Sequence, residues 1–169
     1  MNKAALLIID VQKGLFRRKN WVYNEDILLG NINMLIEKSR DRSIPVIFIR
    51  HTNTSFLQEN SDSWQIHPTL RAKVDDYYFN KEHSSIFDEK NIVDKLREMS
   101  LQTLIVTGLV THGCVKAACI GGIQAGYDVV LVSDGHSSFN ENAKKLIDDW
   151  NGKLSEEGVQ VIAAKDVFV

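Results

Sequence analysis

Runs of consecutive apolar residues are the feature that most constrains the fold of this chain. The first run, Ala4–Ile9, is apolar throughout and stops at Asp10. A strand with one solvated face alternates apolar and polar residues, whereas a strand covered on both faces, as in a parallel sheet, is apolar throughout. Comparable runs occur at residues 46–49, 103–107, 129–132 and 159–162. The sequence therefore predicts buried strands in these segments.

Segments with helical periodicity fill the intervals between the runs. In residues 24–40 the apolar side chains recur three and four positions apart, which places them on one stripe of a helix. Further helices are expected over residues 91–99, 114–125 and 142–150. Gly126 and Gly152 follow the last two of these segments, where glycine commonly ends a helix. Alternating strands and helices predict an α/β fold, a three-layer αβα sandwich with a mostly parallel, Rossmann-like sheet in one domain spanning 1–169.

Composition and charge narrow the class of protein. The 169 residues are 44% hydrophobic and 25% charged, with a formal net charge of −2, as is ordinary for a soluble globular domain. The sequence has no excess of basic residues of the kind that forms a nucleic-acid-binding surface. No apolar run approaches the roughly 20 residues of a membrane span. Cys114 and Cys119 lie five positions apart on one expected helix, a spacing that suits neither a tight disulfide nor a paired zinc motif. We expect a reduced, cytoplasmic protein that binds neither nucleic acid nor membranes.

Residues 51–80 break the alternation of strands and helices. They are rich in Asn, Ser, Asp and aromatic residues, and their periodicity is weak. Long loops inside a compact domain are usually functional. We expect this segment to form a lid or a pocket wall.

Candidate catalytic residues follow the expected strands, because ligands of open α/β sheets bind at the carboxyl ends of the strands. Asp10 ends the first strand, and Cys114 follows the strand at 103–107 in the expected first turn of a helix. The N–H groups and partial positive charge of a helix N-terminus favour a thiolate, the nucleophilic form of cysteine. Position alone leaves Cys114 open to a second reading as a small buried side chain. Cys119 lies on the apolar side of the same expected helix, and we assign it to the core.

Signals for a cofactor or a metal are missing from the sequence. The histidines are scattered, at His51, His67, His83, His112 and His136, without metal-binding spacing. No phosphate-binding loop occurs, and Gly121-Gly122 lies inside an expected helix. We therefore expect no cofactor and no metal.

Three motifs in order resemble the isochorismatase-like cysteine hydrolases, a family that includes the nicotinamidases. The motifs are A-L-L-I-I-D-V-Q at 5–12 with Phe16 following, K-E-H-S-S-I-F at 81–87, and G-L-V-T-H-G-C-V at 108–115. The resemblance extends over nearly the whole chain, as a single isochorismatase-like hydrolase domain. It implies a catalytic triad of Asp10 as general base, Lys81 as the stabilising cation and Cys114 as nucleophile. Lys81 by itself carries little signal, because most lysines are solvated.

The resemblance also implies the surroundings of the triad. A cis peptide bond between Leu109 and Val110 would aim the Val110 N–H, with that of Cys114, at the oxyanion of the substrate. Phe16, Trp64 and Thr111 are expected to line the substrate pocket, with a role in anchoring the loop as the alternative for Trp64. Family members commonly form homo-oligomers, and the aromatic segment around Trp64 and Tyr77-Tyr78 is a candidate interface.

Departures from the family pattern narrow the expected chemistry. Nicotinamidases carry a D-x-H metal motif after the second strand, whereas this chain has Arg50-His51-Thr52-Asn53 there, which favours the metal-free branch. A cysteine nucleophile favours hydrolysis of an amide or ureido C–N bond in a small molecule over cleavage of a vinyl ether. Two alternatives stand beside this hypothesis: a catalytically silent binding or scaffold protein, and a nucleotide-binding enzyme, against which the missing phosphate loop argues.

Overall fold

One sheet of six parallel strands forms the centre of the computed structural model, which describes residues 3–17 and 21–169. The strands are β1 (Ala4–Ile9), β2 (Val46–His51), β3 (Tyr77–Lys81), β4 (Thr103–Leu109), β5 (Asp128–Ser137) and β6 (Gln160–Ile162). Their order across the sheet is β3-β2-β1-β4-β5-β6, and every neighbouring pair is parallel. The predicted α/β fold is confirmed, and the sheet is parallel throughout.

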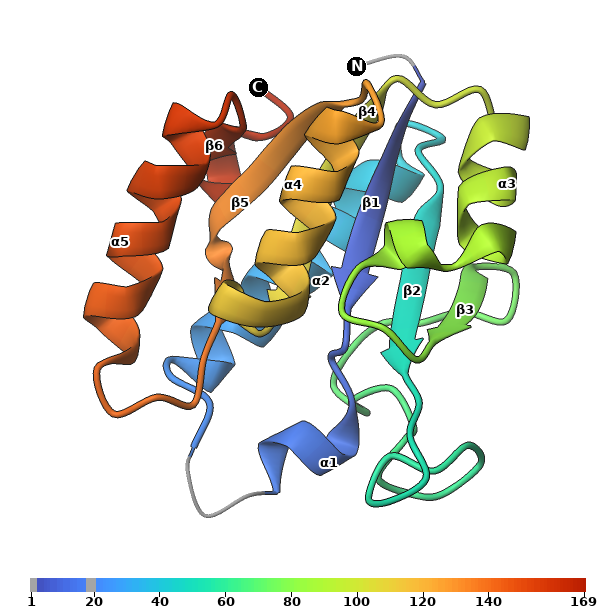
Figure 1. Ribbon diagram of the computed structural model, residues 1–169, viewed down its shortest axis with the longest axis vertical. Helices are drawn as coiled ribbons and strands as arrows, with labels where there is room; N and C mark the ends of the chain where they lie inside the picture. The colour runs from blue at the N-terminus through green and yellow to red at the C-terminus, as the bar shows by residue number, and fades with distance from the viewer. Residues whose placement is uncertain (1–2, 18–20) are drawn as a thin grey trace.

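Helices cover both faces of the sheet (Figure 1). They are α1 (Lys13–Phe16), α2 (Glu25–Arg40), α3 (Lys90–Glu98), α4 (Lys116–Gln124) and α5 (Ala143–Glu156). Helix α2 lies behind the sheet in this view, and α3, α4 and α5 lie in front of it. The short α1 lies beyond the lower end of the strands, close to the point where β1 ends.

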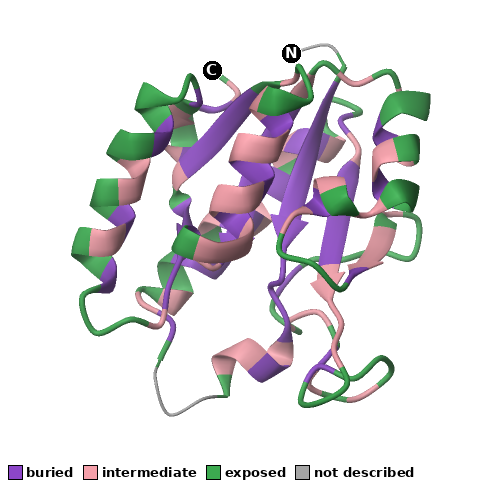
Figure 2. Cartoon of the chain, viewed as in Figure 1, coloured by how far each residue is buried: buried purple, intermediate pink, exposed green. Residues whose placement is uncertain are grey.

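Strand β1 is buried over its whole length, which is why its sequence is apolar throughout (Figure 2). Leu6 and Ile8 belong to the core cluster that contains the buried residues of α2. Leu7 and Ile9 belong to the other cluster, with the buried residues of α3 and α4. Successive side chains of a strand point to opposite faces, so one apolar run supplies both layers of the core.

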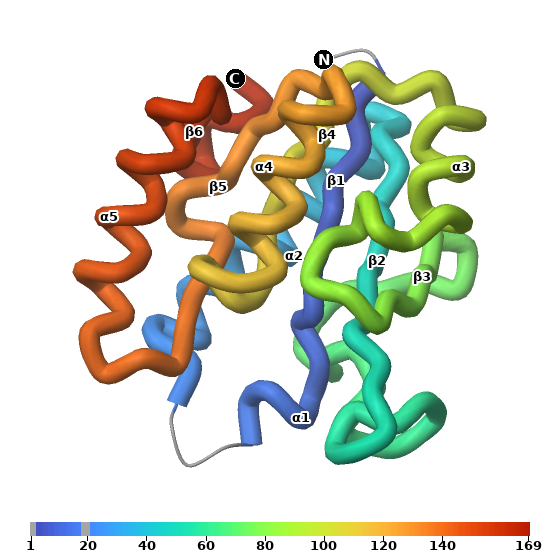
Figure 3. Tube along the Cα trace, viewed as in Figure 1, coloured from blue at the N-terminus to red at the C-terminus, as the bar shows by residue number. Residues whose placement is uncertain are grey.

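Residues 51–80 were predicted to lack regular structure, and strand β3 at the end of this segment shows that this prediction was wrong in part. Tyr77–Lys81 pairs with β2 in parallel and forms the edge of the sheet, with only Lys81 fully buried. An edge strand contacts one neighbour only, so its sequence need not be apolar throughout, and the pattern expected of buried strands is missing. The remainder of the segment forms the long loop beyond β2, beside α1 (Figure 3).

Two predicted helices have different bounds. Helix α5 continues through Gly152, which is exposed in its interior and does not end it. Helix α4 begins at Lys116 rather than at Cys114, because a separate wide turn, Thr111–Val115, precedes it. Gly126 follows the end of α4 with a φ of +87°, as expected of a glycine after a helix.

Gly108 lets β4 pass close to β1 just before the site. It has a φ of +116°, and a Cβ there would lie 2.1 Å from the carbonyl oxygen of Ile9. L-residues rarely adopt this backbone conformation, so both the space and the dihedral angle require glycine.

Alanine at Gly108 is therefore expected to lower the free energy of unfolding by roughly 3 kcal/mol or more, from the clash and the unfavourable φ together. Gly152→Ala is the matched control, because a Cβ at Gly152 would meet nothing within 4 Å. In the interior of α5 that change should raise stability by about 0.5–1 kcal/mol. Urea denaturation followed by circular dichroism measures both variants. Equal stabilities would contradict the close approach of β4 to β1.

No helix in the described part of the chain is long and apolar enough to cross a membrane. The cytoplasmic location stays a prediction.

Candidate active site

Asp10, Lys81 and Cys114 meet at the lower end of the sheet in Figure 1, where β1, β2 and β3 end. Asp10 directly follows β1, Lys81 is the last residue of β3, and Cys114 lies in the turn η2 (Thr111–Val115) beyond β4. The Lys81 Nζ is 3.0 Å from Asp10 Oδ2 and 3.1 Å from Cys114 Sγ. The structure therefore brings together the three residues that the resemblance singled out.

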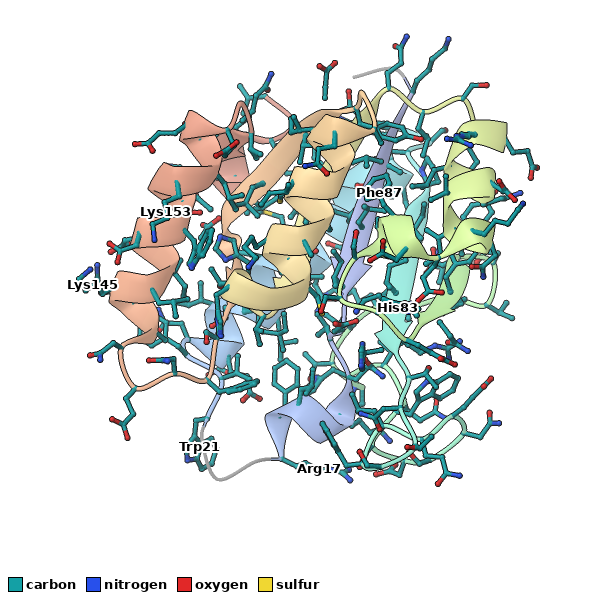
Figure 4. All side chains as sticks on the ribbon, in the orientation of Figure 1. Arg17, Trp21, His83, Phe87, Lys145 and Lys153 are labelled. Atoms are coloured by element: carbon teal, nitrogen blue, oxygen red, sulfur yellow. The ribbon has the colours of Figure 1, made fainter. Side chains whose placement is uncertain are left out.

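The Lys81 ammonium is fully buried and surrounded by acceptors. Besides Asp10 and Cys114, it lies 3.1 Å from His51 Nδ1 and 3.1 Å from the carbonyl oxygen of His83. Figure 4 shows His83 in front of the sheet, at the end where β2 and β3 finish. A buried charge is tolerated only when it is paired and hydrogen-bonded, and these four groups meet that requirement.

His51 is a site residue that the sequence reasoning did not single out. It ends β2 and is in register with Lys81 of β3, so the two side chains lie on neighbouring strands at the same level. The available signal was its place at the carboxyl end of a buried strand, which is the same signal that identified Asp10.

Gln12 fixes the backbone around this cluster. Its Oε1 accepts a hydrogen bond from the His51 N–H at 2.8 Å, and its Nε2 donates to the carbonyl oxygens of His51 and Trp64, both at 3.0 Å. One buried amide thus joins the segment after β1, the end of β2 and the long loop. The arrangement sets the position of His51 relative to Asp10.

Asp10 has one engaged and one free carboxylate oxygen. Oδ2 contacts Lys81, whereas the buried Oδ1 accepts no hydrogen bond from any group in residues 3–17 and 21–169. The Asp10 backbone has a φ of +55°, and its N–H donates to the Ile49 carbonyl oxygen at 2.9 Å. The free oxygen is available to a proton donor inside the site.

The turn that carries Cys114 is irregular. Gly113 interrupts it with a non-helical backbone (φ −113°, ψ −111°), and the Leu109–Val110 peptide bond that precedes it is cis, as expected. Cys114 follows this break, and the next residues, Val115 (φ −63°, ψ −52°) and Lys116 (φ −54°, ψ −48°), have helical backbone that leads into α4. Cys114 therefore lies where the helical backbone begins, as predicted, although regular α4 starts only at Lys116.

The electrostatics of Cys114 differ from the prediction of a favoured thiolate. Burial, followed by the negative charge of Asp10, raises the pKa of the Cys114 thiol to about 11, and the positive charge of Lys81 opposes the shift. At neutral pH the resting side chain is therefore a thiol. Its ionisation requires a base within the site.

The same cluster tests whether a metal ion would fit. Ligand atoms of Asp10, His51 and Cys114 lie within 4.8 Å of one another, the one group of this kind in the described ranges. The Lys81 ammonium, however, lies 3.0–3.1 Å from an atom of each of the three. A metal would have to displace this buried cation, so these residues do not fit a resident ion.

Comparisons with known proteins agree with the fold and the motifs. The family described as the isochorismatase domain matches residues 4–167. The chain belongs to the isochorismatase family. The probable hydrolase YcaC of Escherichia coli (strain K12) is 28% identical over 163 residues, 95% of this chain and 74% of that protein. The nicotinamidase of the same organism is 33% identical over 94 residues, 48% of this chain and 44% of that protein.

Solved structures show the same architecture. A crystal structure of an isochorismatase family protein matches with a TM-score of 0.91 and 28% identity, covering 96% of this chain and 99% of that chain. This protein is therefore an isochorismatase-like hydrolase in which Asp10, Lys81 and Cys114 are clustered. The comparisons leave its substrate open.

The predicted pocket residues of this isochorismatase-family protein lie in different settings. Phe16 ends α1, and its ring centroid is 4.5 Å from that of His67 in the long loop. Trp64 is 4% exposed, donates from Nε1 to Thr52 Oγ1 at 3.0 Å and stacks on the Arg50 guanidinium. These contacts favour the anchoring role for Trp64, and a contact of either ring with substrate stays a prediction.

Trp64 also bears on the predicted oligomer interface. Its own side chain is packed inside the loop, whereas the predicted interface concerns the whole segment around it. Tyr77 is partly exposed, and the Tyr78 hydroxyl donates to the Lys73 carbonyl oxygen at 2.6 Å. Assembly into a homo-oligomer stays a prediction.

Ion pairs join the loop to α1 next to the site. Asp62 accepts from Lys13 at 2.8 Å and also pairs with Arg17, which Figure 4 shows at the lower edge of the molecule. The backbone N–H groups of Lys13 and Gly14 donate to the carbonyl oxygens of Gln65 and Ser63. The loop and α1 are therefore joined beyond the strand ends, and a role of this segment as a lid or a pocket wall stays a prediction.

Thr111 is tied to β5 by its buried hydroxyl. Its Oγ1 is 2.8 Å from His136 Nδ1 and 3.0 Å from the Ser137 carbonyl oxygen, and His136 Nε2 is 2.9 Å from Asn151 Oδ1. Burial lowers the pKa of His136 below its usual 6.5, so the ring is neutral at pH 7. With Nε2–H donated to Asn151, Nδ1 is an acceptor, and it shares the single Thr111 hydroxyl hydrogen with the Ser137 carbonyl oxygen. The hydroxyl thus orients the turn, and any contact of Thr111 with substrate stays a prediction.

Thr111→Val should lower the free energy of unfolding by about 1–3 kcal/mol, because the buried His136 Nδ1 loses its partner at nearly constant side-chain volume. Ser39→Ala is the control, because the Ser39 hydroxyl is also buried yet has no hydrogen-bond partner in the part of the chain described. Its removal should leave stability unchanged or higher. Chemical denaturation of both variants measures the contrast, and an equal loss in both would contradict the assigned network.

Proposed function

We propose that this protein hydrolyses a C–N bond of a small amide or ureido compound, with Cys114 as the nucleophile. The observation that carries the proposal is that the two oxygens of the Asp10 carboxylate have different surroundings. One oxygen is held by the Lys81 ammonium, which also contacts Cys114 Sγ, and the other is buried and unpaired among the residues described. A base beside a thiol, with a cation to stabilise the thiolate, is the arrangement that nucleophilic catalysis requires.

The proposed reaction follows from these positions. Asp10 takes the proton of the Cys114 thiol as the sulfur attacks the carbonyl carbon, and Lys81 stabilises the developing thiolate. N–H groups of Val110 and Cys114 are proposed to hold the oxyanion. The tetrahedral intermediate collapses to a thioester as the proton on Asp10 passes to the departing nitrogen. Water then attacks the thioester with Asp10 as base, which releases the acid and restores the thiol.

The raised pKa of Cys114 supports a base-assisted attack over a preformed thiolate. A thiol with a pKa of about 11 is almost fully protonated at pH 7. The general base must therefore act during the reaction. Similarity to a protein named nicotinamidase supports an amide as the substrate class.

The alternative, a binding or scaffold protein without turnover, gains no support from a specific contact. A binding or scaffold role would not explain why a lysine, a carboxylate and a thiol are buried together at this site.

Cys114→Ala is expected to abolish hydrolysis across a panel of small amides and ureido compounds, with a loss of at least about a thousandfold in kcat. Cys119→Ala is the matched control, because Cys119 is fully buried on the sheet side of α4, in the core cluster that contains Leu7 and Ile9. It should keep the activity of the parent protein. Mass spectrometry of the enzyme during turnover should find the acyl group on Cys114 alone. Undiminished hydrolysis by Cys114→Ala would refute the assignment.

Asp10→Asn is expected to change thiol reactivity and turnover in opposite directions. Removal of the negative charge lowers the pKa of Cys114, so alkylation by iodoacetamide at pH 8–9 should become faster. Loss of the base should slow hydrolysis by about 10²–10⁴-fold. In the parent protein the alkylation rate should still rise between pH 9 and pH 10, where an ordinary thiol is already ionised. Slower alkylation of Asp10→Asn, with its fold confirmed by circular dichroism, would contradict this account.

A further inference from the structure

The contacts of the Lys81 ammonium exceed its hydrogen-bonding capacity. An ammonium group has three N–H donors. Four acceptors surround it: Asp10 Oδ2, Cys114 Sγ, His51 Nδ1 and the carbonyl oxygen of His83. Two of these take part in the proposed chemistry and one is a fixed carbonyl. His51 is the remaining side chain, and the proposed reaction gives it no role.

The contact between His51 and Lys81 defines the state of the imidazole ring. The His51 Nδ1 lies 3.1 Å from the ammonium and can accept a hydrogen bond from it only when Nδ1 carries no hydrogen, as in the neutral ring with its proton on Nε2. A protonated ring would instead direct an N–H and a positive charge at Lys81. The two states of His51 therefore attract and repel the cation of the site.

The backbone of His51 cannot retreat to relieve that repulsion. Gln12 holds it by hydrogen bonds to both the N–H and the carbonyl oxygen, and β3 pairs with it on the other side. The Lys81 ammonium, by contrast, lies at the end of a four-carbon side chain with several rotatable bonds. Protonation of His51 thus displaces the ammonium from Cys114 more readily than it displaces the strand.

We propose that His51 is a positioning residue that holds the Lys81 ammonium against Asp10 and Cys114 while its ring is neutral, and that its protonation switches the site off at acidic pH. As far as it concerns turnover, this rests on the proposed function. The proposed regulation is thus by pH: a histidine and a lysine on neighbouring strands of the site respond to protonation of the histidine.

Charged groups from each surrounding element bear on the ring. They are Asp10 after β1, Lys81 in β3, Glu82 after β3 and Glu89 before α3, and the titratable Cys114 thiol of η2 lies within 4.8 Å of a ring nitrogen. Burial, followed by the charge of Lys81, lowers the pKa of His51 below its usual 6.5, and the three carboxylates oppose this shift. The ring is therefore neutral at pH 7 and takes up its proton only in more acidic solution.

The test compares Cys114 alkylation in the parent protein with that in His51→Asn, whose amide oxygen is an acceptor that does not titrate. Alkylation needs no substrate, so failure of the proposed hydrolysis would not obscure the result. In the parent protein, the logarithm of the alkylation rate should rise with a slope of one at neutral pH. It should steepen towards two at acidic pH, as thiolate formation and the neutral ring are both lost.

His51→Asn should keep a slope of one throughout the pH range, whatever its absolute rate. One pH unit below the midpoint of the His51 titration, the parent should lie about tenfold below the line of slope one. Asp10 is present in both proteins and cannot cause the difference. An equal steepening in the variant, or none in the parent, overturns the proposal.

A second measurement needs no substitution at the site. Nitrogen-15 NMR of histidine-labelled protein should show His51 as the Nε2–H tautomer at pH 7. A cationic ring at pH 7 overturns the proposal. If a substrate is found, the acid limb of kcat/KM should move to lower pH in His51→Asn, whereas a uniform loss without this movement indicates a merely structural role.

Discussion

The buried contact between Lys81 and Asp10 is the interaction on which the rest of the site depends. The side chains are almost fully removed from water, at 0% and 5% exposure, and their charged atoms are 3.0 Å apart. Loss of one partner from such a pair costs about 3–5 kcal/mol, because the other charge remains buried. The positions of Cys114, His51 and the His83 carbonyl are all defined relative to this ammonium. A single cation thus organises a thiol, a carboxylate and an imidazole ring.

The fold brings this cation to the site by strand order. Strands β3, β2 and β1 are adjacent and parallel, so Lys81, His51 and Asp10 all lie at the carboxyl ends of the strands, on the same side of the sheet's length. Strand β4 lies on the other side of β1 and delivers the turn with Cys114. Its close passage at Gly108 places that turn beside Asp10. The chemistry therefore uses groups at the ends of three strands and one group in the turn that follows a fourth.

The sequence predicted the parts of this arrangement that local patterns express. Continuous apolar runs predicted β1, β2 and β4, because strands covered on both faces need apolar side chains at every position. Asp10 could be identified because it ends such a run. Strand β3 could not, since an edge strand makes fewer contacts and Tyr77–Lys81 has no distinctive pattern. Lys81 was therefore found only through a family motif, and His51 was passed over, because its contact with Lys81 is long-range. The start of regular α4 at Lys116, two residues later than predicted, could not be read from the sequence, because the break at Gly113 has no separate signature there.

The protonated state of Cys114 has a consequence for the durability of the protein. Oxidants such as peroxides react with thiolates, and the ladder from sulfenic to sulfonic acid begins at that anion. A cysteine with a pKa near 11 presents almost none of it at neutral pH, although the side chain is not fully enclosed. The reactive sulfur is thus shielded from chance chemistry by its own protonation. We therefore expect peroxide to oxidise Cys114 more slowly at neutral pH than it oxidises a cysteine that is ionised there.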